Sequence, residues 1–570
     1  MNQNKNHIIL KISLSLFFSI LPLGFSLAAQ TAAKRPNIIL IMGDDMGFSD
    51  IGSYGGEIIT PNLDSLASEG LRFTQFYNTA RCCPSRASLL TGLYPHQAGM
   101  GHMVYDRGTP AYRGDLSFDA VTIAEVLKQA GYDSYMSGKW HVTPYVVENP
   151  DKSNWPKQRG FDRFFGIISG AGSYYDPLSL TLENDYIAPW ENFYATTDFT
   201  NYAVKYIEEH KTENPYFLYV PYTAAHWPMH APEEEIAKYK GFYNEGWDAL
   251  RAARYQKMKE MGIVDPQWEL TKRDSLVDAW SENIPDKEWE IANMEVYAAM
   301  IDIMDQGIGE IIRALKVKGE LDNTLIFYLQ DNGACAEDLS WMQSPSNDTL
   351  LKPMAPGELQ TQGMPERTRD GKLVRKMKDA WPGPPEGYTA YGRNWANASN
   401  TPFREYKHWV HEGGIASPLI VHWPDGIKKN KGSLQETPSH LIDIMATCID
   451  VAGAEYPENY RGNKIPVPEG VSLRPVFEDD ALIDRELYWE HEGNRAIRKG
   501  KWKLVSKVSK TRFVETPEKL PLDHWELYDM EKDRTEVKNL AEAYPNLVQE
   551  LSEKWMVWAQ RTGVIPIPRK

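Results

Sequence analysis

Short apolar runs that end in polar residues recur along this chain of 570 residues. The first run, IILIM at 38–42, is followed by Gly-Asp-Asp at 43–45, and the run YFLYV at 216–220 is followed by PYTAAHW. A third run, LIFYL at 325–329, precedes Gln-Asp-Asn-Gly at 330–333. Continuous apolar runs of this length are typical of strands that are buried on both faces of a parallel sheet.

Segments with helical spacing separate these runs. One begins at Pro61 after the capping residue Thr60, and others lie near 122–129, 294–318 and 440–452. Strands that alternate with helices predict an α/β fold in which helices cover both faces of the sheet. Ligands of such sheets bind outside the carboxyl ends of the strands, so we expect the polar tails to meet in one crevice.

Two internal stretches break this alternation. Residues 228–292 are polar and rich in Trp and Lys, and we expect them to be mostly helical. Residues 337–400 are rich in Pro, Gly and Asn, which predicts a long irregular insertion. From about residue 485 apolar and polar residues alternate, which predicts a small antiparallel sheet, closed by an amphipathic C-terminal helix. The chain therefore divides into a large domain at 34–435 and a smaller α+β subdomain at 436–570.

The first 28 residues have the layout of a secretory signal peptide. Lys5 and Lys11 precede a short apolar core, which Pro22 and Gly24 end before small residues at a cleavage site. A membrane anchor is the alternative, but the apolar run is shorter than the ~20 residues of a membrane span. No later stretch is apolar enough to cross a bilayer, so we expect an exported protein, periplasmic or secreted, with no transmembrane segment in the mature chain.

Composition narrows the possible partners. The formal net charge is −16, which argues against nucleic acid, because phosphate binding needs a basic surface. Four cysteines are too few for a disulfide framework. Whether Cys83, Cys335 and Cys448 form any disulfide cannot be read from the sequence.

Acidic and amide side chains end two of the predicted strands. Asp44 and Asp45 follow the first strand, and Asp331 and Asn332 follow a later one. Taken alone, each pair is an ordinary turn sequence. Together at one edge of a sheet, their oxygens would be ligands for one hard divalent cation such as Ca²⁺ or Mg²⁺.

Basic side chains follow the same pattern. Lys139 and His141 lie in SGKWH, His226 lies in AAHWP, and Lys407 lies in REYKHW. Such residues at strand ends are often solvated surface groups. Beside a cation, however, the lysines would bind a tetrahedral oxyanion and the histidines would transfer protons.

The segment RCCPSRASLLTG at 81–92 places two adjacent cysteines at the start of a predicted helix. Pro84 fits the first turn of this helix, so Cys82 would lie near a helix N-terminus, where anionic character is favoured. Cys82 could therefore be a reactive nucleophile. The alternative is that both cysteines are small buried hydrophobes, and we assign Cys83 to that role.

These residues carry a resemblance to a known family. Cys82, Pro84, Ser85 and Arg86, followed by LTG at 90–92, match the type I sulfatase signature C-x-P-S-R-x-x-x-L-T-G in full. Further matches follow in the family's order up to about residue 424: GDDMG, GKWH, the histidine of AAHWP, DNG and the KHWVHEGG segment. The resemblance implies an alkaline-phosphatase-like fold, with a mixed, mostly parallel sheet flanked by helices and a smaller C-terminal subdomain that carries an antiparallel sheet.

The resemblance also implies the chemistry. A maturation enzyme would oxidise Cys82 to formylglycine, whose hydrated form attacks the sulfur of a sulfate ester and regenerates the aldehyde. A divalent metal, Ca²⁺ in preference to Mg²⁺, would be held by Asp44, Asp45, Cys82, Asp331 and Asn332. Asp331 would also accept the nucleophile's proton, and His226 would protonate the leaving alcohol. The other implied catalytic residues are Arg86, Lys139, His141 and Lys407.

Three classes of function remain open on this resemblance. Sulfate ester hydrolysis leads, and a phosphomonoester, phosphodiester or phosphonate hydrolase of the same superfamily is second. A non-catalytic binder of sulfated glycans is third, and it would require that Cys82 is never oxidised. The substrate is expected to be a sulfated carbohydrate or polysaccharide fragment, with an aryl sulfate as the alternative. Sequence proximity to the matched positions suggests the following candidates for substrate contact: Trp227, His230, Glu337, Asp338 and Arg404.

Overall fold

A computed structural model describes residues 34–337, 339–345, 351–479, 484–508 and 524–568. The predicted signal peptide at 1–28 and Asp338 lie outside these residues. The described part of residues 35–570 belongs to one compact unit. Within that part, no helix has the length and apolar character needed to cross a membrane.

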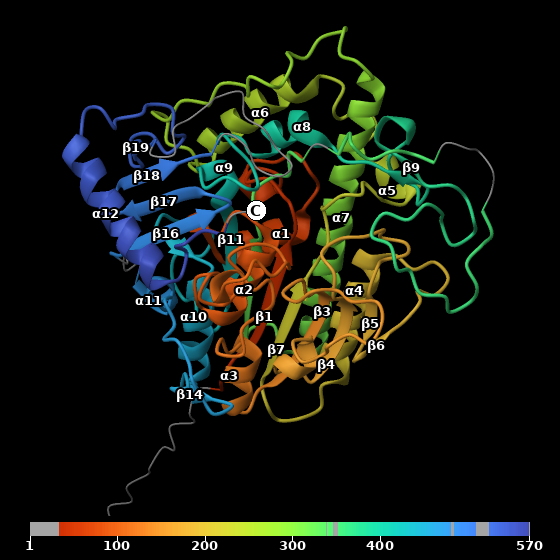
Figure 1. Cartoon of the computed structure of the whole chain (residues 1–570), viewed down its shortest axis with the longest axis horizontal. Coiled ribbons are helices and arrows are strands. Elements are labelled where there is room, and N and C mark those ends of the chain that lie inside the picture. Colours follow the sequence, from red (N-terminus) through yellow and green to blue (C-terminus); the bar gives the residue numbers. More distant parts are fainter. Residues whose placement is uncertain (1–33, 338, 346–350, 480–483, 509–523, 569–570) are drawn as a thin grey trace, which may run out of the picture. The chain divides into compact units, whose positions relative to one another are not determined.

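The large sheet is mixed and mostly parallel, as the sequence predicted (Figure 1). Its parallel centre consists of adjacent strands in the order β8-β1-β7-β3-β4. These strands span Thr324–Gln330 (β8), Asn37–Gly43 (β1), Tyr216–Pro221 (β7), Asp133–Lys139 (β3) and Arg163–Ile167 (β4). The carboxyl ends of these parallel strands therefore lie at one edge of the sheet.

The flanking strands complete this sheet and make it mixed. On one side, β11 runs antiparallel to both β8 and β2, and the short β12 and β13 pair with β2. On the other side, β5 and β6 add two antiparallel strands beyond β4. Their bounds are Leu71–Tyr77 (β2), Leu180–Leu182 (β5), Asp185–Tyr186 (β6), Ala416–His422 (β11), Leu434–Gln435 (β12) and Ser439–His440 (β13).

Helices cover both faces of the sheet, which explains the continuous apolar runs. In β1, Ile39 and Ile41 face one hydrophobic core and Ile38, Leu40 and Met42 face the other. The first core is shared with α1, α4 and α7, and the second with α2, α3 and α10. These helices span Pro61–Glu69 (α1), Cys82–Thr91 (α2), Ile123–Gln129 (α3), Ala195–Glu209 (α4), Lys287–Lys318 (α7) and Ile442–Ala452 (α10).

The two insertions differ in regularity. The first contains α5 (Glu233–Ala237) and α6 (Gly246–Glu260), and it joins α7 through a stretch of turns, so it is less helical than we expected. The second is irregular, as predicted, and its described part has only short elements. They include β9 (Arg375–Lys376), β10 (Gly387–Tyr388) and α8 (Gly392–Ser399), and α9 (Glu412–Ile415) follows the insertion.

The C-terminal antiparallel sheet is also confirmed. Its order is β16-β17-β18-β19, and α12 packs against it through Trp555 and Trp558 (Figure 1). The elements of this region are β14 (Asn459–Tyr460), β15 (Asn463–Lys464), α11 (Arg474–Asp479), β16 (Glu486–His491), β17 (Asn494–Lys499), β18 (Trp502–Ser506), β19 (Glu526–Asp529) and α12 (Pro545–Arg561). The domain boundary at residue 435 stays a prediction.

Candidate active site

The acidic strand ends meet at the carboxyl edge of the large sheet. β1 and β8 are parallel neighbours, with Gly43 opposite Gln330, so the residues that follow them are adjacent. Asn332 Nδ2 donates to Asp45 Oδ1 at 2.7 Å, and the Asp45 backbone N–H donates to Asp331 Oδ1 at 3.3 Å. The close approach also needs Gly333, because a Cβ there would lie 1.8 Å from the Gly413 carbonyl oxygen.

This group of oxygens fits a hard divalent cation. Asp44 Oδ1 and Asn332 Oδ1 are buried, and neither has a hydrogen-bond partner among the described residues. Burial and the neighbouring Asp331 raise the pKa of Asp44 well above its ordinary value. Buried oxygens with unused lone pairs and clustered carboxylates are what such a cation satisfies, since Ca²⁺ and Mg²⁺ take oxygen ligands.

Three buried cations lie against these carboxylates. Lys139, the last residue of β3, places Nζ 2.5 Å from Asp44 Oδ2. Lys407 Nζ lies 2.8 Å from Asp45 Oδ2, and Arg86 Nη2 lies 2.7 Å from Asp331 Oδ2. Burial raises the pKa of Asp45, but the charge of Lys407 outweighs it and lowers that pKa below the ordinary value. The site is therefore rich in paired charges that are almost fully buried.

Helix α2 begins at Cys82, so this thiol lies at the helix N-terminus as predicted. The hydrogen bond from Cys83 lowers the pKa of Cys82 well below its usual range, and the charges of His141 and Lys139 act in the same direction. Burial raises the pKa of Cys83. Cys83 is nevertheless more than packing, because its Sγ lies 3.2 Å from His141 Nε2. All four cysteines are free thiols.

The two histidines are held by backbone geometry. His141 has a positive φ of 54°, and Gly170 lets a loop pass over its ring, since a Cβ there would lie 2.1 Å from His141 Cε1. His226 Nδ1 lies 2.7 Å from the Trp227 carbonyl oxygen, and its Nε2 lies 3.4 Å from Asp45 Oδ2. Burial lowers the pKa of both His141 and His226 to about 4.

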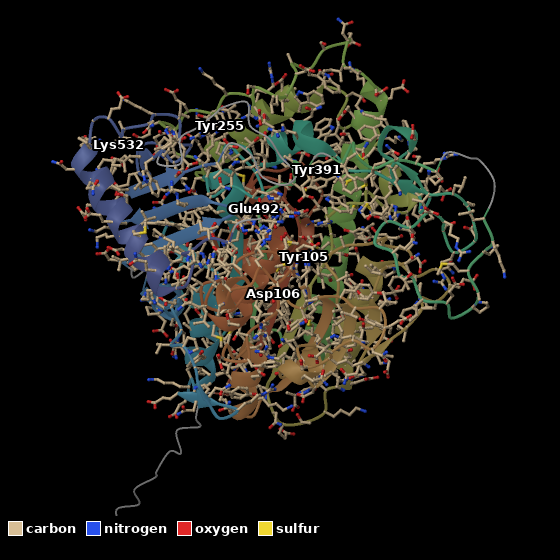
Figure 2. All side chains as sticks on the ribbon, viewed as in Figure 1. Tyr105, Asp106, Tyr255, Tyr391, Glu492 and Lys532 are labelled. Atoms are coloured by element: carbon tan, nitrogen blue, oxygen red, sulfur yellow. The ribbon has the colours of Figure 1, made fainter. Side chains whose placement is uncertain are left out.

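A cavity of about 330 Å³ opens onto these groups. Cys82, His141, His226 and Lys407 form one end of its lining, which we call the sulfur end because Cys82 lies there. The rest of the cavity is available to the remainder of a substrate. Tyr105 and Glu492, both labelled in Figure 2, belong to this outer part.

The sequence candidates for substrate contact divide into two groups. Trp227 and Glu337 line the cavity, and Trp227 Nε1 donates to Glu337 Oε2 at 2.9 Å. His230 is not in the lining; it lies near the Tyr174 backbone N–H and the Gly387 carbonyl oxygen and holds the insertions together. Arg404 is also outside the lining, because it pairs with Glu526. A role in substrate contact stays a prediction for these two residues.

Sequence reasoning did not find several polar residues of the cavity lining. Those with a charged or imidazole side chain are Arg81, His102 and Glu492. Glu492 lies in the turn between β16 and β17, where Glu492 (φ 52°) and Gly493 (φ 91°) both have positive φ, as a type I′ hairpin turn requires. A glutamate is unusual at that position, and this Glu-Gly turn was the available signal. Tertiary structure alone brings Glu492 into the same cavity lining as Cys82.

Comparison with known protein families agrees with the resemblance to sulfatases over most of the chain. The Sulfatase family model matches residues 36–454. A second model, described as N-sulphoglucosamine sulphohydrolase, C-terminal, matches residues 405–560. Together these matches include all the site residues described above.

Individual relatives extend over nearly the whole chain. An uncharacterized sulfatase of Schizosaccharomyces pombe is 33% identical over 95% of this chain and 96% of its own length. An arylsulfatase of Klebsiella aerogenes is 32% identical over 82% of this chain and 97% of its own. A structure solved in complex with its substrate, D-glucosamine-2-N,6-O-disulfate, shares the fold with a TM-score of 0.58 at 22% identity, covering 94% of this chain and 100% of that one. The chain therefore belongs to the type I sulfatase family of the alkaline phosphatase superfamily, and it is a sulfuric ester hydrolase.

Proposed function

We propose that the protein hydrolyses sulfate esters to an alcohol and inorganic sulfate with formylglycine, formed from Cys82, as the nucleophile. The observation that carries this proposal is the position of Cys82, at the N-terminus of α2 and in the lining of a cavity that also holds Lys407, His141 and His226. Hydrated formylglycine supplies one hydroxyl that attacks sulfur and a second that lets the aldehyde re-form. A formylglycine-generating maturation enzyme is the partner that this chemistry requires.

The acidic strand ends would hold the divalent cation. Its ligands would be Asp44, Asp45, Asp331, Asn332 and the modified Cys82. We favour Ca²⁺ over Mg²⁺, because Ca²⁺ accepts several carboxylates in irregular geometry whereas Mg²⁺ demands a near-ideal octahedron. When bound, the cation would polarise the sulfate oxygens and lower the pKa of the nucleophile.

The chain's own residues have separate tasks in this mechanism. Lys139 and Lys407 bind sulfate oxygens and oppose the negative charge that develops as the S–O bond breaks. Arg86 fixes Asp331, its ion-pair partner at 2.7 Å, and Asp331 accepts the proton of the attacking hydroxyl. His226 donates a proton to the leaving oxygen; burial keeps its pKa low, and the negative charge of a bound sulfate ester opposes that shift. His141 receives the proton that is lost when sulfate is expelled.

For the substrate, we propose a sulfated carbohydrate. The second family model is named for an N-sulphoglucosamine sulphohydrolase, and the solved structure cited above holds a sulfated glucosamine. Aromatic side chains in the cavity lining, among them Tyr105, Trp227 and Trp341, offer faces on which a sugar ring can stack. The similarity to an arylsulfatase supports aryl sulfates as the second candidate. Export to the periplasm or medium is proposed from the leader-like sequence and suits a polysaccharide substrate.

Mass spectrometry of the peptide that contains Cys82 tests this function. We expect this peptide to be lighter than its cysteine form by the mass difference between CH₂SH and CHO. Cys82→Ala should abolish sulfate release from sulfated oligosaccharides and aryl sulfates, while Cys83→Ala should retain the formylglycine. An active protein whose Cys82 is an unmodified thiol would refute the proposal.

A further inference from the structure

The outer part of the cavity has an apolar wall built from segments far apart in sequence. The side chains of this wall come from a loop after α2, from the segment just before β5 and from the second insertion. They are Met103, Val104, Tyr105, Leu178, Leu339 and Trp341. Apart from the Tyr hydroxyl and the Trp N–H, these side chains offer only apolar surface to a leaving alcohol.

Every Arg or Lys in the described lining already faces carboxylates. Arg81 Nη2 lies 3.3 Å from Glu337 Oε1, and Arg81 Nη1 lies 4.0 Å from Glu492 Oε1. Lys407 Nζ lies 2.8 Å from Asp45 Oδ2 and 3.4 Å from Glu337 Oε1. Two cations therefore face three carboxylates, so the two basic side chains of the lining supply no surplus positive charge.

Glu492 is held rigidly in this arrangement. Its Oε1 lies 3.1 Å from His102 Nε2, and its Oε2 lies 2.8 Å from His408 Nδ1. The nearby Arg107 is not in the lining, and its Nη2 lies 2.9 Å from His102 Nε2. Its charge is thus directed at the histidine that binds Glu492.

Glu337 and Glu492, the two carboxylates in the described lining, are ionised. Burial raises the pKa of Glu337, but the charges of Lys407 and Arg81 hold it well below its ordinary value. Burial also raises the pKa of Glu492, but His408 and His102 hold it well below its ordinary value. A second anionic group on the substrate would therefore meet two fixed negative charges in a partly desolvated cavity, where like charges repel strongly.

We propose that this sulfatase selects substrates whose leaving alcohol carries no negative charge. A monosulfated neutral sugar or an uncharged phenol would fit between the apolar wall and the Glu337–Arg81–Glu492 array, and carboxylated or further sulfated alcohols would be rejected. The carboxylates can still accept hydrogen bonds from hydroxyl groups. The inference rests on the proposed function, since it concerns the alcohol part of the same sulfate ester.

A matched pair of aryl sulfates tests this selectivity: 4-(methoxycarbonyl)phenyl sulfate and 4-carboxyphenyl sulfate. We expect kcat/KM to be at least ~100-fold lower for the carboxylate, because like-charge juxtaposition is a strong discriminator. The loss should appear mainly in KM, since the different leaving ability of the two phenols acts on kcat. Comparable KM values for the two esters would overturn the inference while sulfate release still supports the proposed function; sulfate release from neither these esters nor sulfated oligosaccharides would overturn the function itself.

A charge-neutralising variant identifies the groups responsible. Glu492→Gln keeps the shape of the side chain and removes one negative charge, so the ratio of the two KM values should narrow by at least ~10-fold. Glu213→Gln, at an exposed position outside the cavity lining, is the control and should leave the ratio unchanged. If a folded Glu492→Gln protein retains the full ratio, Glu492 does not determine the selectivity, and the proposal fails in this form. If that variant does not fold, the wild-type ratio alone decides.

Discussion

Three buried carboxylates and three buried cations lie beside or at the sulfur end of the cavity. Asp44 pairs with Lys139, Asp45 with Lys407, and Asp331 with Arg86. Buried ions persist when they are paired, and here the six charges sum to zero. A divalent cation bound among them would therefore make the site net positive. That charge would be complementary to the anionic sulfate ester, which would explain why one site contains both acids and bases.

Asn332→Ala tests the cation site. The change removes one oxygen ligand and leaves the three carboxylates and their ion pairs in place. We expect the affinity for Ca²⁺ to fall by at least ~10-fold, as measured by titration calorimetry on chelator-treated protein. Asn244→Ala, at an exposed position, should bind as the wild type does. Equal affinities of the two variants would exclude Asn332 as a ligand.

His226→Ala tests the assignment of the general acid. Proton donation matters most when the leaving alcohol is a poor leaving group. We expect kcat to fall by ~10²–10⁴-fold for an alkyl sugar sulfate and by much less for 4-nitrophenyl sulfate, whose phenolate leaves unaided. Steady-state kinetics on both esters give the comparison. An equal loss on both would assign His226 to binding or positioning instead.

At the level of elements, the sequence pattern around Thr60 and Pro61 correctly predicts where helix α1 begins but not which residue caps it. The helix begins at Pro61 after Thr60, as the sequence predicted, but the Thr60 hydroxyl accepts from the Gly52 backbone N–H instead of capping the helix. Asp305 of α7 takes that role: its carboxylate accepts from the backbone N–H groups of Asn62 at 3.0 Å and Leu63 at 2.8 Å. A helix N-terminus with an anion beside it is stabilised by both the hydrogen bonds and the helix dipole.

Asp305→Asn should change how stability depends on pH. Burial raises the pKa of Asp305 to about 6 from 3.8, so the folded state holds this proton more tightly than the unfolded state does. The carboxyl group's contribution to stability is therefore fully present below about pH 4 and is lost as pH rises through 6. Melting temperatures of both proteins between pH 5 and 7.5 give the test: the wild type should lose stability relative to the variant as pH rises. A constant difference would show that Asp305 does not titrate in this range.

The strands themselves were readable from sequence for a physical reason. A run such as 38–42 is apolar at every position because β1 meets a core on each face, and only its end can be polar. The candidate ligands at 44–45 and 331–332 were therefore visible as polar interruptions of the apolar pattern. The secondary structure of the first insertion could not be predicted in the same way, because its Trp and Lys residues fit helices and turns equally well.

At the scale of the whole molecule, the C-terminal sheet completes a cavity that the large sheet begins. Glu492 lies 411 positions after Arg81, and no periodicity in either segment predicts that they meet. The same limit applies to His230 and Arg404, whose partners Gly387 and Glu526 are distant in sequence. The grouping of polar residues near the sulfur end could be predicted because the ends of parallel strands share one edge of the sheet. The outer part of the cavity could not be predicted, because it depends on tertiary contacts between insertions and hairpins.

A second buried charge cluster joins the C-terminal sheet to the segment that follows Lys407. Lys503 of β18 lies 2.8 Å from both Glu412 Oε1 and Glu536 Oε1, and Arg534 Nε lies 3.0 Å from Glu412 Oε2. Glu412 is the first residue of α9, five positions after Lys407. The cluster thereby ties the position of a proposed sulfate-binding lysine to the fold of the C-terminal region.

Lys503→Met should destabilise the protein strongly, because it leaves Glu412 and Glu536 buried with one cation fewer. Removing one partner of a buried ion pair typically costs about 3–5 kcal/mol, and the urea midpoint should fall accordingly. Lys499→Met on the adjacent strand β17 is the matched control, since Lys499 forms a solvent-exposed pair with Glu550 and its loss should change the midpoint little. Similar midpoints for the two variants would mean that the buried cluster does not hold the C-terminal sheet in place. Because Glu492 reaches the cavity from that sheet, a destabilised Lys503→Met protein should also lose selectivity between neutral and carboxylated aryl sulfates before it loses all activity.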